Sequence, residues 1–277
     1  MSEKQALQST GQEVFPRSWG VYWAVAKVTF LEVIRDKLLY NSVVVSVLLF
    51  AVGVLVSKLA VVMSAERVIL DFGLSAMRLS GSIIAILVGS VLIARELERR
   101  TIHVALCHPI TQAQFVVGKY LGIVMVLLLN WFLSAVAEFC LLILFNDTHE
   151  PVMNATLGWA MIFALVESWL MASVAVFFSS FTTTSLSIIF CIGLYGVGQN
   201  ISEMRLVAHQ SAVPWQGALL DGLARCLPNL EVFNFGNKVT YSLPVPWQFI
   251  GYGLAYACVL ITLFLVLSGF LLRFKEL

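Results

Sequence analysis

The residues of this chain whose types could do chemistry form two short groups, and neither matches a catalytic pattern. His103, Cys107 and His108 are types that bind zinc, but a structural zinc site takes four such ligands and the sequence offers no fourth one nearby. The pair Gly118-Lys119 resembles the end of a phosphate-binding loop, but a tyrosine follows where Ser or Thr is needed. We therefore expect no catalytic residue and no metal site in this chain.

A second kind of chemistry is suggested by polar side chains inside strongly apolar stretches. Inserting a charge at the middle of a membrane helix costs about 2.5–3.5 kcal/mol. Arg78 and Glu138 are predicted at similar depth near the outer ends of neighbouring spans, so we expect a buried ion pair between them. Glu167 has no opposite charge at its predicted depth. It is either protonated, turned toward a partner subunit, lining a translocation path, or packed against Ser or Thr of a neighbouring span, as we expect for Asn130.

A third group is a dense charge cluster that directly follows an apolar stretch. Glu96, Glu98, Arg99 and Arg100 lie within five residues, and Pro109 ends or bends the segment that follows them. Such a cluster is suited to ion pairs with a soluble partner. The alternative is a solvated face that only enforces membrane orientation.

Composition restricts the kind of molecule that carries these groups. Of 277 residues, 60% are hydrophobic and only 12% are charged, whereas soluble domains carry about 25% charged residues. The net charge is +1, and the sequence contains no basic stripe dense enough for nucleic acid. The five cysteines form no Cys-x-x-Cys pair, so we expect no disulfide framework. The first twenty residues lack an apolar core, so we expect no cleaved signal peptide.

The apolar stretches predict an all-α integral membrane protein, a single domain over 1–277 with six transmembrane helices. Each stretch meets or approaches the roughly 20 residues that a membrane-spanning helix needs. The predicted spans are 41–63, 72–94, 120–145, 155–179, 183–197 and 249–272.

The distribution of Lys and Arg predicts the orientation, because cytoplasmic loops carry an excess of basic residues. Most of them fall before the first span, between spans two and three, and after span six. We therefore expect both termini in the cytoplasm and an even number of spans. The basic residues on the predicted cytoplasmic side are Lys4, Arg17, Lys27, Arg35, Lys37, Arg95, Arg99, Arg100, Lys119, Arg273 and Lys275.

Three segments outside the spans have a helical pattern. Residues 21–39 predict an amphipathic helix that lies at the membrane interface, with a polar sector, although a cytoplasmic extension of the first span is the alternative. That sector comprises Thr29, Glu32, Arg35 and Asp36. Residues 95–119 predict a helix, a turn at Pro109 and a return helix from about Thr111.

The segment 200–247 is predicted to be a long outer loop that contains one short helix. Pro214 and Pro228 bracket a stretch of leucines at helical spacing. Asp221 and Arg225 are four residues apart on the other face of this helix, so we expect them to pair. An ordinary loop with a local hydrophobic cluster is the alternative.

The order of these segments resembles the membrane, or permease, subunit of type-2 ABC exporters. The motif that carries the resemblance runs Glu96-Leu-Glu98-Arg-Arg100-Thr101, then Pro109-Ile-Thr111, Phe115 and Gly118-Lys119. In topology the resemblance covers essentially the whole chain, and in motif about 25 residues. The chain departs from the usual pattern at two positions, with Arg100 where Gly is common and Gln112 where Arg is frequent.

The resemblance implies a half-transporter without enzymatic activity of its own, in the inner membrane of a prokaryote. Two copies of this subunit, or one copy and a related permease, would join two cytoplasmic ABC ATPase subunits, which would bind ATP and Mg²⁺. The residues implied in contact with the ATPase are Glu96, Glu98, Arg99, Arg100, Thr101 and Pro109 of the coupling segment, with Glu32, Arg35 and Asp36 of the N-terminal helix.

Two other functions remain open from the sequence. One is an ion- or proton-coupled secondary transporter in which Glu138 or Glu167 carries the proton, although such transporters usually show inverted repeats that are not visible here. The other is a membrane enzyme or assembly factor without transport activity.

Overall fold

The computed structural model describes residues 18–35, 65–98, 111–145, 155–210, 214–236 and 245–275, with residues 44, 47–48, 51–52, 54–55 and 239. Every regular element in these ranges is a helix, so the predicted all-α class is confirmed for them. The elements are α2 (Ser18–Arg35), α4 (Ala65–Glu98), α6 (Gln112–Phe145), α7 (Ala155–Ser179), α8 (Thr184–Gly198), α9 (Ile201–Gln210), α10 (Pro214–Cys226), the 3₁₀ turn η1 (Glu231–Phe233) and α12 (Trp247–Lys275).

Four of these helices, α4, α6, α7 and α12, are long and apolar enough to cross a membrane. α8 has 15 residues, about 22 Å of helix, which is shorter than the ~30 Å hydrocarbon core. It qualifies as a span only together with α9, from which a bend of 66° separates it. The described residues therefore contain four or five of the predicted spans. The first predicted span, 41–63, lies largely outside them.

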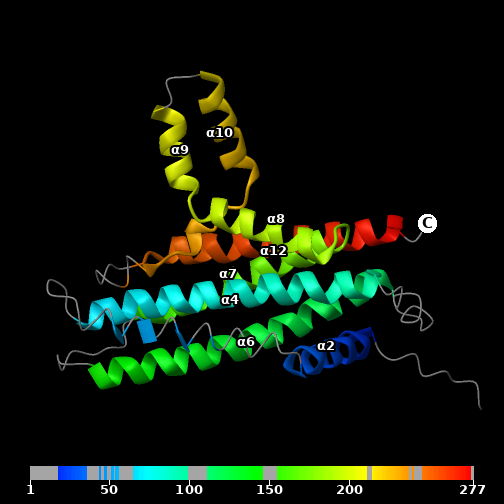
Figure 1. Ribbon diagram of the computed structural model, residues 1–277, viewed down its shortest axis with the longest axis horizontal. Coiled ribbons are helices and arrows are strands. Elements are labelled where there is room, and N and C mark those ends of the chain that lie inside the picture. The colour runs from blue at the N-terminus through cyan, green and yellow to red at the C-terminus, as the bar shows by residue number, and fades with distance from the viewer. Residues whose placement is uncertain are drawn as a thin grey trace, which may run out of the picture.

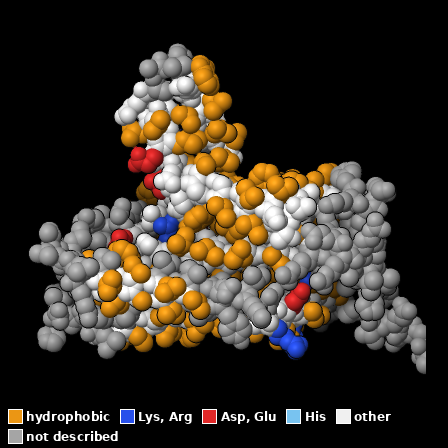
Figure 2. Space-filling model, in the orientation of Figure 1, with side chains coloured by type: hydrophobic (Ala, Val, Ile, Leu, Met, Phe, Trp, Pro, Cys, Tyr) orange, Lys and Arg blue, Asp and Glu red, His pale blue; other side chains and the backbone are white. Residues whose placement is uncertain are grey.

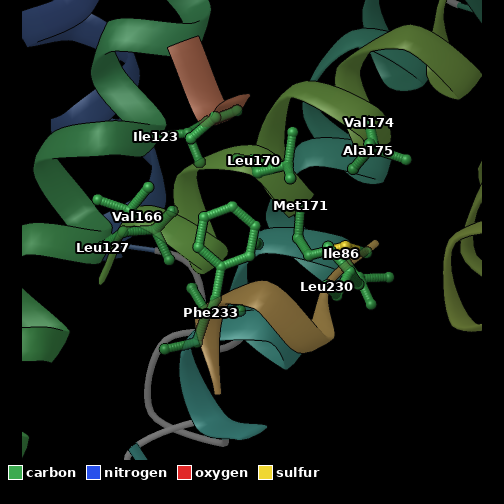
Figure 3. Close-up of a cluster of buried hydrophobic side chains, with 14 of the residues drawn as sticks. Ile86, Ile123, Leu127, Val166, Leu170, Met171, Val174, Ala175, Leu230 and Phe233 are labelled. Atoms are coloured by element: carbon green, nitrogen blue, oxygen red, sulfur yellow. The ribbon is translucent and has the colours of Figure 1, made fainter. Parts of the chain in front are cut away.

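α4 and α7 form the centre of the bundle, and most of the spanning window of each is buried (72%), against 11% for α12. Two glycines of α4 allow the close approach. A Cβ on Gly81 would lie 2.9 Å from Ser168 Oγ, and one on Gly89 would lie 2.7 Å from Ala175 Cβ. The surrounding core is aliphatic and aromatic; Figure 3 shows Leu170 and Met171 of α7 within it.

α2 packs along the first turns of α6, and the two helices lie side by side in Figure 1. Gly122 of α6 lies against Thr29, where an added Cβ would be 2.5 Å from that side chain's own Cβ. Thr29, which was predicted on the polar sector of this helix, is consequently fully buried against α6. Apolar side chains such as Trp23 and Leu31 are exposed instead. The interfacial position of this helix stays a prediction.

The two helices α9 and α10 form a helical hairpin that stands away from the bundle (Figure 1). One short helix was predicted in the segment 200–247, whereas the structure has two helices there, α9 and α10. α10 begins at Pro214, and its predicted pair is confirmed, because Arg225 donates a hydrogen bond to Asp221 at 2.6 Å. Both the bundle surface and one edge of the hairpin carry many hydrophobic side chains in Figure 2.

Candidate functional site

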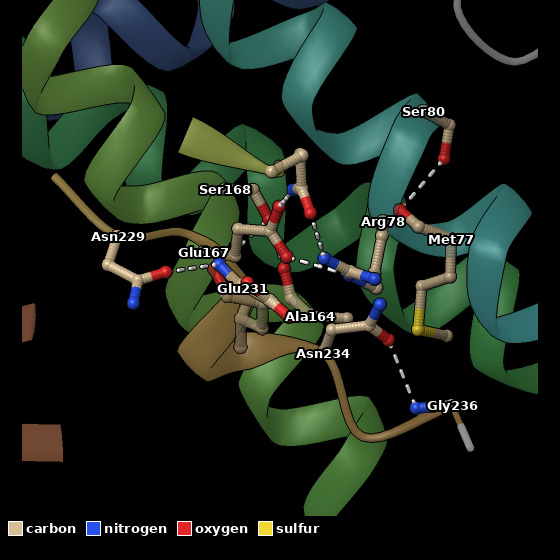
Figure 4. A network of polar contacts seen from close by, with 12 residues as sticks. Met77, Arg78, Ser80, Ala164, Glu167, Ser168, Asn229, Glu231, Asn234 and Gly236 are labelled. Atoms are coloured by element: carbon tan, nitrogen blue, oxygen red, sulfur yellow. Dashed lines mark hydrogen bonds and ion pairs between the residues drawn. The ribbon is translucent and has the colours of Figure 1, made fainter. Parts of the chain in front are cut away.

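A buried ion pair joins α4 to α7. Arg78 Nε donates to Glu167 Oε2 at 2.8 Å (Figure 4), and Arg78 Nη2 donates to Gln199 Oε1, also at 2.8 Å. The Gln199 amide nitrogen donates in turn to the other oxygen of Glu167. We call these three residues the Arg78 network. The expected pair between Arg78 and Glu138 is wrong, and so is the expectation that Glu167 has no opposite charge at its depth.

Burial makes the Arg78 network energetically important. The Glu167 side chain is fully buried and that of Arg78 is 12% exposed. Both carboxylate oxygens of Glu167 accept a hydrogen bond from the other two residues. Removing one partner of such a pair leaves an uncompensated buried charge, which typically costs about 3–5 kcal/mol.

The tryptophans of α7 and α12 indicate the depth of the network. Trp159 and Trp247 contact edge to face, with ring centroids 5.8 Å apart, and tryptophan concentrates at membrane interfaces. Ser179 follows Trp159 by twenty residues, about 30 Å of helix, which equals the thickness of the hydrocarbon core. Glu167 follows Trp159 by eight residues, which is about 12 Å along the helix. This places the network at hydrocarbon depth.

The network also reaches the base of the α9–α10 hairpin, because Gln199 directly follows the last residue of α8. Two hydrogen bonds join the segment that enters the hairpin to the segment that leaves it. Leu230 N donates to Gly198 O at 2.9 Å, and Ser202 N donates to Glu231 Oε2 at 3.1 Å. The Arg78 network therefore connects α4 and α7 directly to the base of the hairpin through Gln199.

Glu138 lies on α6 away from the Arg78 network. Its side chain is fully buried, and no donor among the described residues reaches either carboxylate oxygen. It packs on Gly73 of α4, where an added Cβ would lie 2.8 Å from the Glu138 carboxyl. Asn130, eight residues earlier on α6, is also buried.

The residues implied in contact with an ATPase are described only in part. Glu96 and Glu98 lie at the C-terminal end of α4. Glu32 of α2 is about half exposed and forms an ion pair with Lys119 of α6 at 3.4 Å, while Arg35 ends α2 and is exposed. The coupling residues outside the described ranges are Asp36, Arg99, Arg100, Thr101 and Pro109.

Metal binding finds no geometric support in the described part of the chain, where no three His, Cys, Asp or Glu side chains come together. His103, Cys107 and His108 lie outside that part.

Gln199 is the site residue that the sequence reasoning missed. An amide at the end of an apolar helix looked like ordinary loop sequence. A usable signal existed, because Tyr195 and Gln199 continue a polar series spaced by four residues along α8, beginning at Ser187 and Cys191. This spacing places all four side chains on one helix face.

Comparison with known proteins agrees with this architecture. The family model described as ABC-2 family transporter protein matches residues 23–275. No curated protein matches the sequence closely enough to be counted as a relative. The family match covers every described helix from α4 to α12 and most of α2. The chain, a multi-pass membrane protein, therefore belongs to the ABC-2 transporter family.

Proposed function

We propose that this chain is the permease subunit of an ATP-driven exporter and couples ATP hydrolysis in a separate ATPase subunit to movement of its membrane helices. The observation that carries the proposal is the continuity of α4. This helix runs from Ala65 to Glu98 and contains both Arg78 and the acidic residues that open the coupling segment. From Arg78 to Glu98 it extends about 30 Å.

The proposal needs a rigid connection, and α4 supplies one. Close packing against α7 at Gly81 and Gly89 fixes the position of the C-terminal half of α4. A push on its cytoplasmic end would therefore move α4 as one body and reach the Arg78 network. From there it would reach the base of the α9–α10 hairpin through Gln199.

The other end of the coupling segment supports the same mechanism. α6 begins at Gln112, within the last part of that segment, and α2 is joined to its first turns by close packing at Gly118 and Gly122. The ion pair between Glu32 and Lys119 ties the two helices a second time. α2 and α6 would thus move together under the same push.

The proposed assembly contains this chain twice, or once beside a related permease, with two cytoplasmic ABC ATPase subunits. ATP and Mg²⁺ would be held by the ATPase subunits. The proposed location is the inner membrane of a prokaryote, with both termini in the cytoplasm.

Co-purification tests the proposal. The protein, solubilised in mild detergent from its native membrane, should bring an ATPase with it, and its activity should stop when ATP is depleted. Reversing the cluster with Glu98→Arg and Arg99→Glu should detach or uncouple that ATPase while the permease stays folded. Exchanging Asp221 and Arg225 is the matched control, because that pair lies on the hairpin and should leave association unchanged. Purification of the chain alone, with ATP-independent activity, would contradict the proposal.

One observation favours proton-coupled transport as a second candidate. Glu138 is a fully buried carboxyl without a donor among the described residues, as expected for a group that takes up and releases a proton. In that case Glu138→Gln would abolish transport driven by a pH gradient in vesicles that lack ATP. In the ATP-driven exporter such vesicles show no transport with either side chain.

A further inference from the structure

The contact between α4 and α6, which lie side by side in Figure 1, contains a carboxyl group without a hydrogen-bond donor. Glu138 of α6 is fully buried, and no donor among the described residues reaches either of its oxygens. It continues a series of buried polar residues at intervals of four on one face of α6, after Asn130 and Ser134. Buried polar groups are nearly always hydrogen-bonded, so this carboxyl requires a specific explanation.

The packing on the α4 side of Glu138 leaves room for nothing larger than a proton. A Cβ added to Gly73 of α4 would lie 2.8 Å from both Cδ and Oε1 of Glu138, so the carboxyl lies directly on the α4 backbone. A metal ion would need further ligands, and no three His, Cys, Asp or Glu side chains come together in the described ranges. The ligand that fits this carboxyl is therefore a proton.

No charged side chain in the described part of the chain compensates an ionised Glu138, since none acts on its carboxyl. On α4, Asp71 is exposed and Arg78 is engaged in the Arg78 network. α7 has Glu167 of the same network as its one charged residue, and α12 has none before its last turn. On α6 itself the other charged residue is Lys119, far along the helix and paired with α2.

Burial without compensation favours the neutral form of Glu138. An unpaired ionised group inside a protein costs several kcal/mol, whereas a neutral polar group without a partner costs about 1–3 kcal/mol. The packed contact between α4 and α6 is therefore compatible with a protonated Glu138 and not with an ionised one. Loss of the proton would force the carboxylate toward water and separate the two helices at this point.

Glu138 lies toward the end of the bundle that carries Trp159, which is the outer end in the proposed orientation. α6 runs antiparallel to α7. Trp131 Nε1 donates to Met161 O at 2.7 Å, two residues after Trp159. Glu138 follows Trp131 by seven residues, about 10 Å toward that end. Because tryptophan marks the membrane interface, a small separation of α4 and α6 there would connect the carboxyl with outer water.

We propose that Glu138 is a proton-binding site that holds the outer ends of α4 and α6 together while it is protonated. When these ends separate, the O–H bond of the carboxyl breaks and the proton passes to outer water, because a solvated glutamate is ionised near neutral pH. The ends pack again only after a proton returns from the same side. No proton crosses the membrane in this cycle, which distinguishes the site from the carrier of a proton-coupled transporter.

The proposal gives the packed contact a definite pH dependence. Since the protonated form is the packed form, the stabilisation is present at low pH and is lost as the outer pH rises. The site itself does not depend on the ATP-driven function. Its consequence for transport does rest on that function: repacking becomes slow at high outer pH, so ATP-driven transport falls.

Thermal unfolding of the detergent-solubilised complex tests the site without transport. Relative to Glu138→Gln, the unfolding temperature of the wild type should fall by about 3 °C or more between about pH 6 and about pH 9. Glutamine resembles the protonated side chain in size and charge, so it removes only the titration. Glu203→Gln removes an exposed carboxyl of the hairpin and should keep the wild-type pH dependence. Equal pH dependence of Glu138→Gln and the wild type would overturn the proposal.

Infrared spectroscopy detects the proton directly and does not require the glutamine variant to be stable. The wild-type complex should show the C=O band of a protonated carboxyl at neutral pH, where solvated glutamates are ionised. Gly73→Ala should weaken or shift this band, because its methyl group displaces the Glu138 carboxyl. Gly158→Ala, whose methyl group enters open space, should leave it unchanged. A wild-type spectrum without such a band, or a band that Gly73→Ala leaves unaltered, would overturn the proposal.

Proteoliposomes with the ATPase bound test the consequence for transport. Raising the pH on the outer side alone should lower ATP-driven transport by about threefold or more in the wild type and have no such effect in Glu138→Gln. Net proton movement across the membrane that depends on Glu138 would overturn the proposal in favour of a proton carrier. Absence of an ATPase would overturn the proposed function and leave the unfolding and infrared results standing, whereas a pH-independent contact in a transporting complex would overturn only the proton site.

Discussion

At the scale of single residues, the most consequential feature is that one arginine satisfies a buried carboxylate and an amide together. Arg78 uses Nε for Glu167 and Nη2 for Gln199. A guanidinium is suited to this because its donors lie in a fixed planar fork. A lysine at position 78 would carry the same charge without that geometry, so the three helices that meet here depend on arginine specifically.

The Arg78 network predicts strong non-additivity between its members. Arg78→Met or Glu167→Met alone should lower the free energy of unfolding by about 3–5 kcal/mol, because each leaves an unpaired buried charge. The double variant should lose less than either single variant. Thermal unfolding, followed by a fluorogenic reagent that reacts with buried Cys191 on exposure, measures the effect.

The exposed pair on the hairpin is the matched control for that measurement. Asp221 and Arg225 are four residues apart on one helix, with the Arg225 side chain 74% exposed. Breaking this pair should change stability by no more than about 0.5 kcal/mol. Additive losses at Arg78 and Glu167 would show that the two residues do not act as a pair.

At the scale of helices, glycines decide which elements pack as one body. Gly89 brings α4 against α7, and Gly122 brings α6 against α2. Gly158 and Gly193 have open space where a side chain would lie. The chain thus contains both close-contact glycines and unconstrained ones, and the two kinds respond oppositely to the same substitution.

The α4–α7 contact predicts overpacking at Gly89. Gly89→Ala places a methyl group 2.7 Å from Ala175 Cβ, so we expect destabilisation of about 1–3 kcal/mol. Combining it with Ala175→Gly should restore most of the loss. Gly158→Ala, on the same pair of helices but in open space, should be neutral or stabilising, since alanine favours a helix over glycine. Equal effects at both glycines in thermal unfolding would contradict this packing.

The α2–α6 contact predicts a loss of coupling rather than of folding. Gly122→Leu should displace α2 from α6, because even a Cβ would be 2.5 Å from Thr29 Cβ. We expect the ATPase to remain bound while ATP-driven transport falls. Gly20→Leu, where nothing lies within 4 Å, is the control and should transport normally. Normal transport by the Gly122 variant would show that α2 takes no part in transmission.

At the scale of the whole molecule, the C-terminal end of α4 and the N-terminal end of α6 lie on one side of the bundle, and the hairpin lies toward the other half (Figure 1). α4 and α7 enter from the side that carries Trp159, and α6 runs in the opposite direction. The hairpin is attached near the middle of the bundle through Gln199. Force applied at one end would therefore be delivered to the middle of the membrane first.

The predicted orientation can be tested on intact spheroplasts. Tags at both termini should be protected from added protease. The physical reason is the concentration of basic residues in the segments predicted to be cytoplasmic. A C-terminal tag cleaved from outside would indicate an odd number of spans.

Most of the helical architecture was predictable because it depends on local properties of the chain. An apolar run of sufficient length must form a helix in a membrane, since every backbone polar group needs an internal partner there. The predicted stretch 155–179 coincides with α7, and the predicted return helix near Thr111 corresponds to α6. The helices α9 and α10 were harder to predict, because short helices outside the bundle lack the long apolar run that marks a membrane span.

The choice of charge partners was not predictable, because it depends on relative depth and rotation of helices. From the sequence alone Arg78 had two acidic candidates, and equal predicted depth favoured Glu138. The tertiary structure pairs it with Glu167, because the glycine contacts turn α4 toward α7 and the bend after α8 brings Gln199 to the same point. The burial of Thr29 was not predictable for a similar reason, since Gly122 on a distant segment makes room for it.

By itself the sequence determined that the chain is a helical membrane protein, which segments are long and apolar enough to cross, and which family it resembles. These properties follow from apolar runs and short motifs, which are local. Only the tertiary structure decided that Arg78, Glu167 and Gln199 form one network, that Glu138 stands apart from it, and that the polar face of α8 meets α4. Those outcomes depend on the packing of helices against each other, where a single missing Cβ sets the contact.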